Sequence, residues 1–175
     1  MPSIRSPRGR LSLLVLLALA LGACLLRDLS KSFNSPQPEA AWRQCIRVVD
    51  ADTIDLENGE RLRLIGVDAP ETRHPRRGRE ICGPEATAFV EQLALGRRVR
   101  LSYDWDRLDP FGRTLAYVYL EDGTMLNAEV IRQGYAHAYR KFRYRLKEDF
   151  LEYELEAHRE RRGCLPLLAP NMPRE

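Results

Sequence analysis

The chain has 175 residues, which leaves room for one domain of ordinary size. It carries 28 lysines and arginines against 25 aspartates and glutamates, and its formal net charge is +3. Arg5, Arg8 and Arg10 lie in an N-terminal stretch without any acid, so the rest of the chain is close to neutral. This balance excludes a surface that is basic throughout, and any affinity for a polyanion must come from local patches.

The N-terminal stretch has the pattern of an export signal. Residues 11–26, LSLLVLLALALGACLL, carry no charge, and this run is shorter than the roughly twenty residues that a membrane-spanning helix needs. The motif LGAC, Leu21 to Cys24, resembles the lipobox of bacterial lipoproteins, in which the cysteine becomes the acylated first residue. We therefore expect residues 1–23 to be a signal peptide and Cys24 to be lipidated. The alternative is a short uncleaved anchor in which Cys24 is an incidental thiol.

The next segment, residues 24–41, is expected to be a tether. It is polar, contains proline and shows no hydrophobic periodicity. The folded domain is then predicted over residues 42–164. Residues 165–175 form a tail with three prolines that is not expected to continue a helix.

Alternating and turn-containing segments predict the strands of this domain. Asn58-Gly59 is a pair that closes tight hairpins, and Asp122-Gly123 is expected to end the last strand in a turn. The predicted strands occupy residues 44–50, 53–67 with the hairpin inside, 98–104 and 113–126.

Three segments have the features of helices. One starts with Pro84 in its first turn and ends before Gly96, and a short one is closed by Gly134. Residues 146–163 have apolar side chains near helical spacing and charges elsewhere, so they predict an amphipathic helix. About five short strands joined mostly by turns, with two or three helices, predict a small barrel with helices outside it.

Four widely spaced cysteines without a CxxC pair do not favour a zinc site. If Cys24 carries lipid, at most one internal disulfide can form. Cys82 with Cys164 is the expected pair, because Cys45 lies inside a predicted strand; the alternative is three buried free thiols.

Several common catalytic motifs are missing from the sequence. It contains no GxSxG, HExxH, GxxxxGK[ST] or GxGxxG pattern. His74, His137 and His158 are isolated and need no role beyond that of surface residues. Acids and arginines therefore carry the candidate chemistry.

Four acids follow two predicted strands. Asp50 and Asp52 flank Ala51, whereas Asp68 and Glu71 end the strand that contains Arg63. If both strand ends meet at one rim of the barrel, several carboxylates converge, and such hard oxygen ligands suit Ca²⁺ or Mg²⁺. Each acid taken alone also has the simpler explanation of a turn residue.

Arg63 and Asp68 are five residues apart, so a regular strand would send them to opposite faces. Gly66 lies between them, and we predict a bend there that re-aims one of the two side chains. A third element is DPFGR, in which Asp109, Pro110 and Gly112 form a turn before Arg113. An arginine at the start of a strand beside acids is suited to bidentate binding of a phosphate.

At this point the chain resembles the staphylococcal nuclease, or thermonuclease, family. The segments VVDADTI, RLRLIGVDAPETRHPRRG, CGPEATAFV, DPFGRTLAYVY and NAEVIRQGYA follow the order and spacing of that family over roughly residues 43–163. The resemblance implies a five-stranded OB-fold barrel with about three helices, a mainly β member of the α+β class. It also implies Ca²⁺-dependent hydrolysis of phosphodiester bonds in DNA and RNA.

The resemblance also implies a role for each site residue. Asp52, Asp68 and the main-chain carbonyl of Ala69 would bind calcium, with Asp50 behind them. Glu71 would be the general base that activates water. Arg63 and Arg113 would bind the scissile phosphate. The positions implied in substrate binding are Arg76, Arg77, Phe111 and Tyr139.

The sequence departs from the family in four places. Ala51 replaces a glycine, Ala69 replaces a threonine, and Phe111 lacks the hydroxyl of a tyrosine. The segment after Tyr139, RKFRYRLK, is shorter and richer in arginine than the family's loop. None of these changes removes a proposed catalytic group.

The sequence therefore predicts an exported, lipid-anchored, monomeric nuclease of the bacterial cell envelope, with secretion as the alternative location. Its substrates would be single- or double-stranded DNA and RNA, bound through phosphates with little sequence preference. One rival is an OB-fold module that binds single strands without cutting them. Another is a lipoprotein that contacts other envelope proteins.

Overall fold

The computed structural model describes residues 41–72 and 80–168. All of the described residues belong to one compact unit. The predicted signal peptide with Cys24, nearly all of the tether, Arg76 and Arg77, and residues 169–175 of the tail lie outside the described residues. Across the two described ranges, no helix combines the length and the apolar character needed to cross a membrane.

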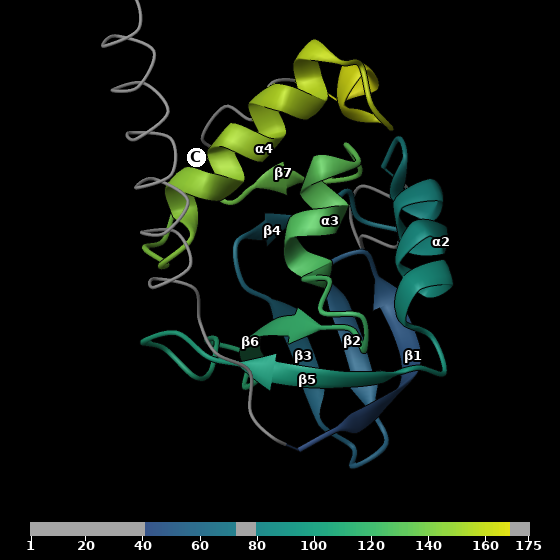
Figure 1. Ribbon diagram of the computed structural model, residues 1–175, viewed down its shortest axis with the longest axis vertical. Coiled ribbons are helices and arrows are strands. Elements are labelled where there is room, and N and C mark those ends of the chain that lie inside the picture. Colours follow the sequence, from purple (N-terminus) through teal and green to yellow (C-terminus); the bar gives the residue numbers. More distant parts are fainter. Residues whose placement is uncertain (1–40, 73–79, 169–175) are drawn as a thin grey trace, which may run out of the picture. The chain divides into compact units, whose positions relative to one another are not determined.

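Five strands close into a barrel in the order β1-β2-β3-β6-β5 (Figure 1). Neighbouring strands are antiparallel except for β3 and β6, which run parallel. The bounds are β1 Arg43–Asp50, β2 Thr53–Leu56, β3 Arg61–Leu64, β5 Arg98–Ser102 and β6 Thr114–Tyr119. With three α-helices in the described part of the chain, this architecture confirms the predicted five-stranded OB-fold barrel.

Alternation along the strands explains the barrel core. In β3, Leu62 and Leu64 are buried while Arg61 and Arg63 point outward, as a period of two requires. The largest fully buried side chains include Ile54, Leu101 and Tyr117 from three other strands. The outward side chains of β3 therefore lie on the wall of the barrel, where each pairs with an aspartate: Arg61 with Asp55 and Arg63 with Asp52.

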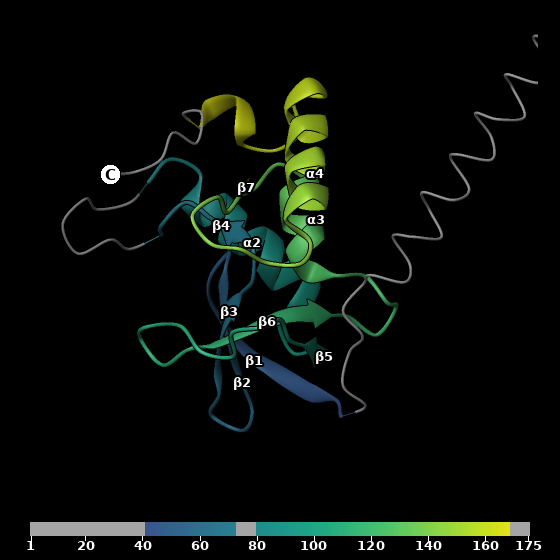
Figure 2. The ribbon, with the colours of Figure 1, turned by 90° about the vertical axis from the view of Figure 1, so that its left-hand side faces the viewer.

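Three helices gather at one end of the barrel (Figures 1 and 2): α2 Gly83–Ala94, α3 Leu126–Arg132 and α4 Lys147–Arg159. Helix α2 packs against β1, and α3 packs against both β6 and α4. Pro84 lies in the first turn of α2, as the sequence predicts. A 3₁₀ turn, Leu165–Leu167, follows α4 and buries Leu165.

A pair of two-residue strands was not predicted. β4, Val67–Asp68, and β7, His137–Ala138, are antiparallel and pair Asp68 with His137. The predicted bend precedes β4, because β3 stops at Leu64 and Gly66 has a φ of +79°. A Cβ atom at Gly66 would also lie 2.7 Å from the rings of Phe150 and Tyr144, so only glycine fits this position.

The cysteines pair as predicted. Cys82, directly before α2, forms a disulfide with Cys164, directly before the 3₁₀ turn, and Cys45 is a buried free thiol. The bridge joins residues that are 82 positions apart. It fixes the start of α2 to the C-terminal end of the described fold.

Candidate active site

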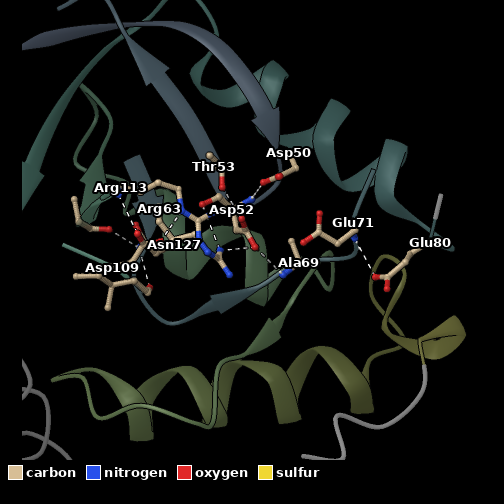
Figure 3. A network of polar contacts seen from close by, with 12 residues as sticks. Asp50, Asp52, Thr53, Arg63, Ala69, Glu71, Glu80, Asp109, Arg113 and Asn127 are labelled. Atoms are coloured by element: carbon tan, nitrogen blue, oxygen red, sulfur yellow. Dashed lines mark hydrogen bonds and ion pairs between the residues drawn. The ribbon is translucent and has the colours of Figure 1, made fainter. Parts of the chain in front are cut away.

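The turn between β1 and β2 carries two of the predicted acids. Asp50 accepts a hydrogen bond from the backbone amide of Asp52 at 3.2 Å, so it holds the turn that presents the second acid (Figure 3). Asp52 is 6% exposed, and its Oδ1 accepts a hydrogen bond from Thr53 Oγ1 at 2.8 Å. Its Oδ2 contacts the guanidinium of Arg63 and accepts from the Ala69 amide at 3.4 Å. The carboxylate of Asp52 therefore joins three elements.

Burial raises the pKa of Asp52 to about 7, although the charge of Arg63 opposes the shift. The neighbouring charge of Asp50 adds to the increase. Burial therefore disfavours the ionised form of the Asp52 carboxylate. A further cation beside it would favour the ionised form.

The two predicted phosphate-binding arginines come from neighbouring parts of the barrel: Arg63 lies in β3, and Arg113 directly precedes β6, which runs parallel to β3. Leu62 of β3 pairs with Thr114 of β6, so Arg63 and Arg113 lie at neighbouring positions on the wall of the barrel. Arg113 donates from Nε to Asp109 Oδ2 at 2.6 Å and from its backbone amide to Asp109 Oδ1 at 2.9 Å. Each arginine is thus oriented by one aspartate.

Asp109 organises the turn before β6. It also accepts a hydrogen bond from the amide of Phe111 at 2.8 Å. Burial raises the pKa of Asp109, but the hydrogen bonds from the backbone and side chain of Arg113 outweigh that effect and leave its pKa below the ordinary value. An ionised Asp109 therefore keeps Arg113 at the mouth of the strand.

Two hollows meet at Arg113. A groove of about 560 Å³ is lined by Arg63, Arg113, Phe111 and Tyr139, among others. A second hollow of about 660 Å³ is lined by Arg113, Phe111 and Glu71. Both predicted arginines therefore line the groove, whereas the predicted base lines the second hollow with Arg113. Figure 3 shows Glu71 on the far side of Asp52 from Arg113.

The backbone of Glu71 is fixed by Glu80, a residue that the sequence did not indicate as part of the site. Its backbone amide donates to Glu80 Oε2 at 3.0 Å, and its carbonyl accepts from the amide of Glu80 at 3.0 Å (Figure 3). Gly83 packs on the same segment, because a Cβ there would lie 2.8 Å from the Glu71 carbonyl oxygen. Glu80 and Gly83 thus fix the backbone of Glu71 against the start of α2.

The pairing of β4 with β7 brings Asp68 close to Tyr139. Asp68 is on β4, and Tyr139 follows β7 and donates its amide to the Gly66 carbonyl at 2.8 Å. The pKa of Tyr139 is raised by burial and by the charge of Asp68, while Arg63 opposes the increase. Tyr139 therefore lies within electrostatic range of a predicted metal ligand and a predicted phosphate ligand.

The predicted calcium ligands are all hard oxygen donors, which is the chemistry that Ca²⁺ prefers. Over residues 41–72 and 80–168, no three His, Cys, Asp or Glu side chains are grouped to hold a metal ion. The predicted set contains only two carboxylates, Asp52 and Asp68, with the carbonyl of Ala69. The donor chemistry of this set suits the ion, and water or phosphate oxygens would have to complete the shell.

Three further residues support the site and were missed. Thr53 bonds Asp52, and Glu154 of α4 binds Nδ1 of His137, the strand partner of Asp68, at 2.7 Å. The expectation that His137 is a surface residue was wrong, because its side chain is buried against α4. Asn127 is fully buried and bonds the backbone groups of Ala116 and Val118 in β6 and of Ile65, which follows β3. It is the second residue of α3, and asparagine is common at the start of a helix, so nothing in the local sequence indicates this structural role.

Comparisons with known proteins agree with this architecture. A family model described as "Staphylococcal nuclease homologue" matches residues 61–164. The thermonuclease of Staphylococcus intermedius is 44% identical over 95 residues, and that of Staphylococcus hyicus is 42% identical over 96 residues. Each alignment covers 53% of this chain and 56% of the relative, so the chain spans little more than half of those proteins. Endonuclease YhcR of Bacillus subtilis (strain 168) is 30% identical over 140 residues, which are 74% of this chain and 12% of that protein.

Proposed function

Because the chain belongs to the staphylococcal nuclease homologue family, we propose that it is a nuclease that hydrolyses phosphodiester bonds of DNA and RNA. One observation carries the proposal: Arg63 of β3 and Arg113, which directly precedes the parallel strand β6, line one groove, and Arg63 contacts the buried Asp52. The printed names of the relatives, thermonuclease and endonuclease, are consistent with it.

The arginines are proposed to bind the scissile phosphate. Each guanidinium has five N–H donors, and the aspartate that orients it uses only part of them. The remaining donors of Arg63 and Arg113 would bind the phosphate oxygens and stabilise the charge that grows when water attacks phosphorus. Lysine lacks this planar fork and would not replace either residue well.

Glu71 is proposed to be the general base. Its carboxylate would take a proton from water as the water oxygen bonds to phosphorus. The bond from phosphorus to the leaving oxygen would break, its electron pair would stay on that oxygen, and the oxygen would take a proton from solvent. General base catalysis typically contributes about 10² to 10⁴ in rate. The two hydrogen bonds to Glu80 support this role, because they fix the backbone from which the Glu71 side chain extends.

We propose that Asp52, Asp68 and the carbonyl of Ala69 bind Ca²⁺, with Asp50 holding the turn behind them. When bound, the ion would supply positive charge that offsets repulsion between the attacking oxygen and the anionic phosphodiester. Phe111 and Tyr139 line the groove and would contact the nucleotide. Arg76 and Arg77 would add a local basic patch whose effect weakens with salt.

The remaining sequence predictions stand as proposals. The chain would be an exported, monomeric lipoprotein with a signal peptide over residues 1–23, lipid on Cys24, a tether to residue 41, a domain over residues 42–164 and a tail to residue 175. The support is the basic and apolar N-terminal pattern and the LGAC motif. Radiolabelled fatty acid should label the wild-type chain and not Cys24→Ser; equal labelling of both would contradict the proposal.

The catalytic proposal is tested by incubating the chain with single- and double-stranded DNA and with RNA, in calcium or in chelator. Cleavage in calcium alone is expected. Glu71→Gln should lower kcat by about 10² or more, whereas Glu91→Gln, an exposed residue of α2, should not. Binding without cleavage would instead favour a non-catalytic OB-fold module, and full activity of Glu71→Gln would exclude Glu71 as the base.

A further inference from the structure

We propose that Trp105, Phe142 and Arg143 form a further subsite that stacks an unpaired base of single-stranded nucleic acid. The subsite would lie along the groove beyond the phosphate-binding arginines. It rests on the proposed nuclease function and specifies the substrate that this groove favours. It also gives a role to part of the arginine-rich RKFRYRLK segment, which the proposed catalytic roles leave unused.

The distribution of exposed aromatic rings carries the proposal. Trp105 is 60% exposed, Phe111 is 84% exposed and Phe142 is 64% exposed. They are the three aromatic side chains classed as exposed among the described residues, and all three line the 560 Å³ groove that also contains Arg63 and Arg113. Exposed apolar side chains that gather in one groove indicate a binding surface.

Two loops build this part of the groove. Trp105 lies between β5 and β6, whereas Phe142 and Arg143 lie between β7 and α4. Asp104 joins the loops, because its Oδ2 accepts hydrogen bonds from the Arg145 amide at 2.6 Å and from Tyr117 Oη at 2.7 Å. These hydrogen bonds hold together the two loops that carry the rings of Trp105 and Phe142.

The rings are also placed relative to one another. The ring of Phe142 stacks on that of Tyr139 with centroids 5.3 Å apart, and the Arg143 guanidinium lies 5.7 Å from the Trp105 ring centroid. Tyr139 therefore links the subsite to the proposed phosphate site. A strand bound at Arg63 and Arg113 would meet Tyr139 first and then Phe142.

The charges of the groove suit a polyanion. Arg63, Arg113 and Arg143 line it, and two of its three acids are already engaged by other residues. Asp109 is bound by Arg113, and the carboxylate of Asp104 is 5% exposed and lies 3.9 Å from the guanidinium of Arg145. The third, Asp106, is exposed. Cationic side chains beside open aromatic faces are the features that bind nucleic-acid single strands.

Stacking explains why the occupant would be single-stranded. An unpaired base presents its flat face to an aromatic ring, whereas the bases of a duplex are stacked on each other. Every base has such a face, so the subsite would discriminate strandedness rather than sequence.

A kinetic comparison tests the subsite. The full chain, purified in detergent, is assayed on oligothymidylates of increasing length and on a thymidine nitrophenyl phosphodiester, which spans only the scissile bond. For Trp105→Ala and Phe142→Ala, KM for the oligonucleotides should rise about 5- to 100-fold more than KM for the small substrate, as the loss of one stacked base predicts. Leu155→Ala, which removes a 50% exposed side chain on α4, is the control and should change neither KM. Equal changes for both substrates would overturn the proposal.

A binding measurement separates this proposal from catalysis. The chain has two tryptophans, so Trp42→Phe leaves Trp105 as the only one. In chelator, oligothymidylate should quench its fluorescence and duplex DNA should quench it much less. Absence of quenching overturns the subsite even if the protein cleaves DNA. Quenching by a chain that cleaves nothing supports the subsite while the nuclease proposal fails.

Discussion

Arg63 and Asp52 bind each other directly, and their side chains are only 17% and 9% exposed. The proposed phosphate ligand and the proposed metal ligand are therefore one buried ion pair. Removing either partner leaves the other charge without its partner in a poorly solvated place, which is strongly destabilising. Substitutions that keep the charge are the informative ones.

Arg63→Lys keeps the positive charge near Asp52 and removes the planar fork. We expect kcat to fall by about 10² to 10³, the usual effect of removing one donor to a charged transition state. The change in thermal stability should be small. Arg98→Lys is the control, because Arg98 pairs with Glu121 on the surface, where the two side chains are 62% and 51% exposed. An unchanged kcat in Arg63→Lys would contradict the bidentate role.

Gly66→Ala should destabilise the fold and impair activity together. The substitution places a Cβ at φ +79° and 2.7 Å from two buried rings. Gly123→Ala is the matched control, because its φ is +87° but nothing lies within 4 Å. The control should lose roughly 1 kcal/mol in urea unfolding, and Gly66→Ala about 1–3 kcal/mol more. Equal losses would mean that crowding by Phe150 and Tyr144 has no effect.

Replacing both Cys82 and Cys164 by serine should lower the free energy of unfolding by about 4 kcal/mol, because the bridge closes a long loop of the unfolded chain. Reduction of the wild-type protein should lower it by a similar amount. The reductant should leave the double variant unchanged, since Cys45 is the remaining thiol of the described residues and is free. A stability that does not respond to reduction would contradict the prediction.

Glu154 makes stability depend on pH. It is 4% exposed, and although burial raises its pKa, hydrogen bonds from His137 and Arg140 outweigh burial and hold the pKa below the ordinary 4.5. The folded state therefore favours the ionised form. This stabilisation is present above pH 4.5 and is lost as the pH falls through the lower pKa of the folded state.

Glu154→Gln tests this dependence. At pH 7 it should lose about 2 kcal/mol in urea unfolding, and the difference from wild type should shrink below pH 4.5. Glu156→Gln is the control on the same helix, because its side chain is 52% exposed and pairs with Arg162 at the surface. A difference that stays constant with pH would show that the charge of Glu154 does not matter.

Local patterns made most of the fold predictable. The alternation of Arg61, Leu62, Arg63 and Leu64 placed β3 correctly, and the odd spacing of Arg63 and Asp68 required the bend found at Gly66. The Cys82–Cys164 pair was expected because Cys45 lies inside a predicted strand, but the sequence left three free thiols as an alternative. The strand and the bend depend on a few neighbouring residues, so they can be predicted from one sequence.

The unpredicted features depend on contacts between distant residues. β4 and β7 have two residues each, which is too short for a periodic pattern, and they form only because residues 67 and 138 meet in the fold. Glu80 has no distinguishing feature in the sequence, and its hydrogen bond with the Glu71 amide forms only in the folded chain.

Ala51 and Ala69 depart from the family pattern. Both are buried at the site, and the Ala69 amide still donates a hydrogen bond to Asp52.

Two reciprocal hydrogen bonds connect Glu71 and Glu80 on either side of residues 73–79. Because these bonds hold the backbone of Glu71, we expect the composition of residues 73–79 to be replaceable without moving the proposed general base. Replacing residues 73–79 by a glycine–serine segment of equal length should raise KM for long DNA, because Arg76 and Arg77 are lost, and should leave kcat near the wild-type value. A collapse of kcat would show that the segment itself positions Glu71. If kcat survives, substrate affinity in this protein can be varied in residues 73–79 while the proposed hydrolytic groups stay in place.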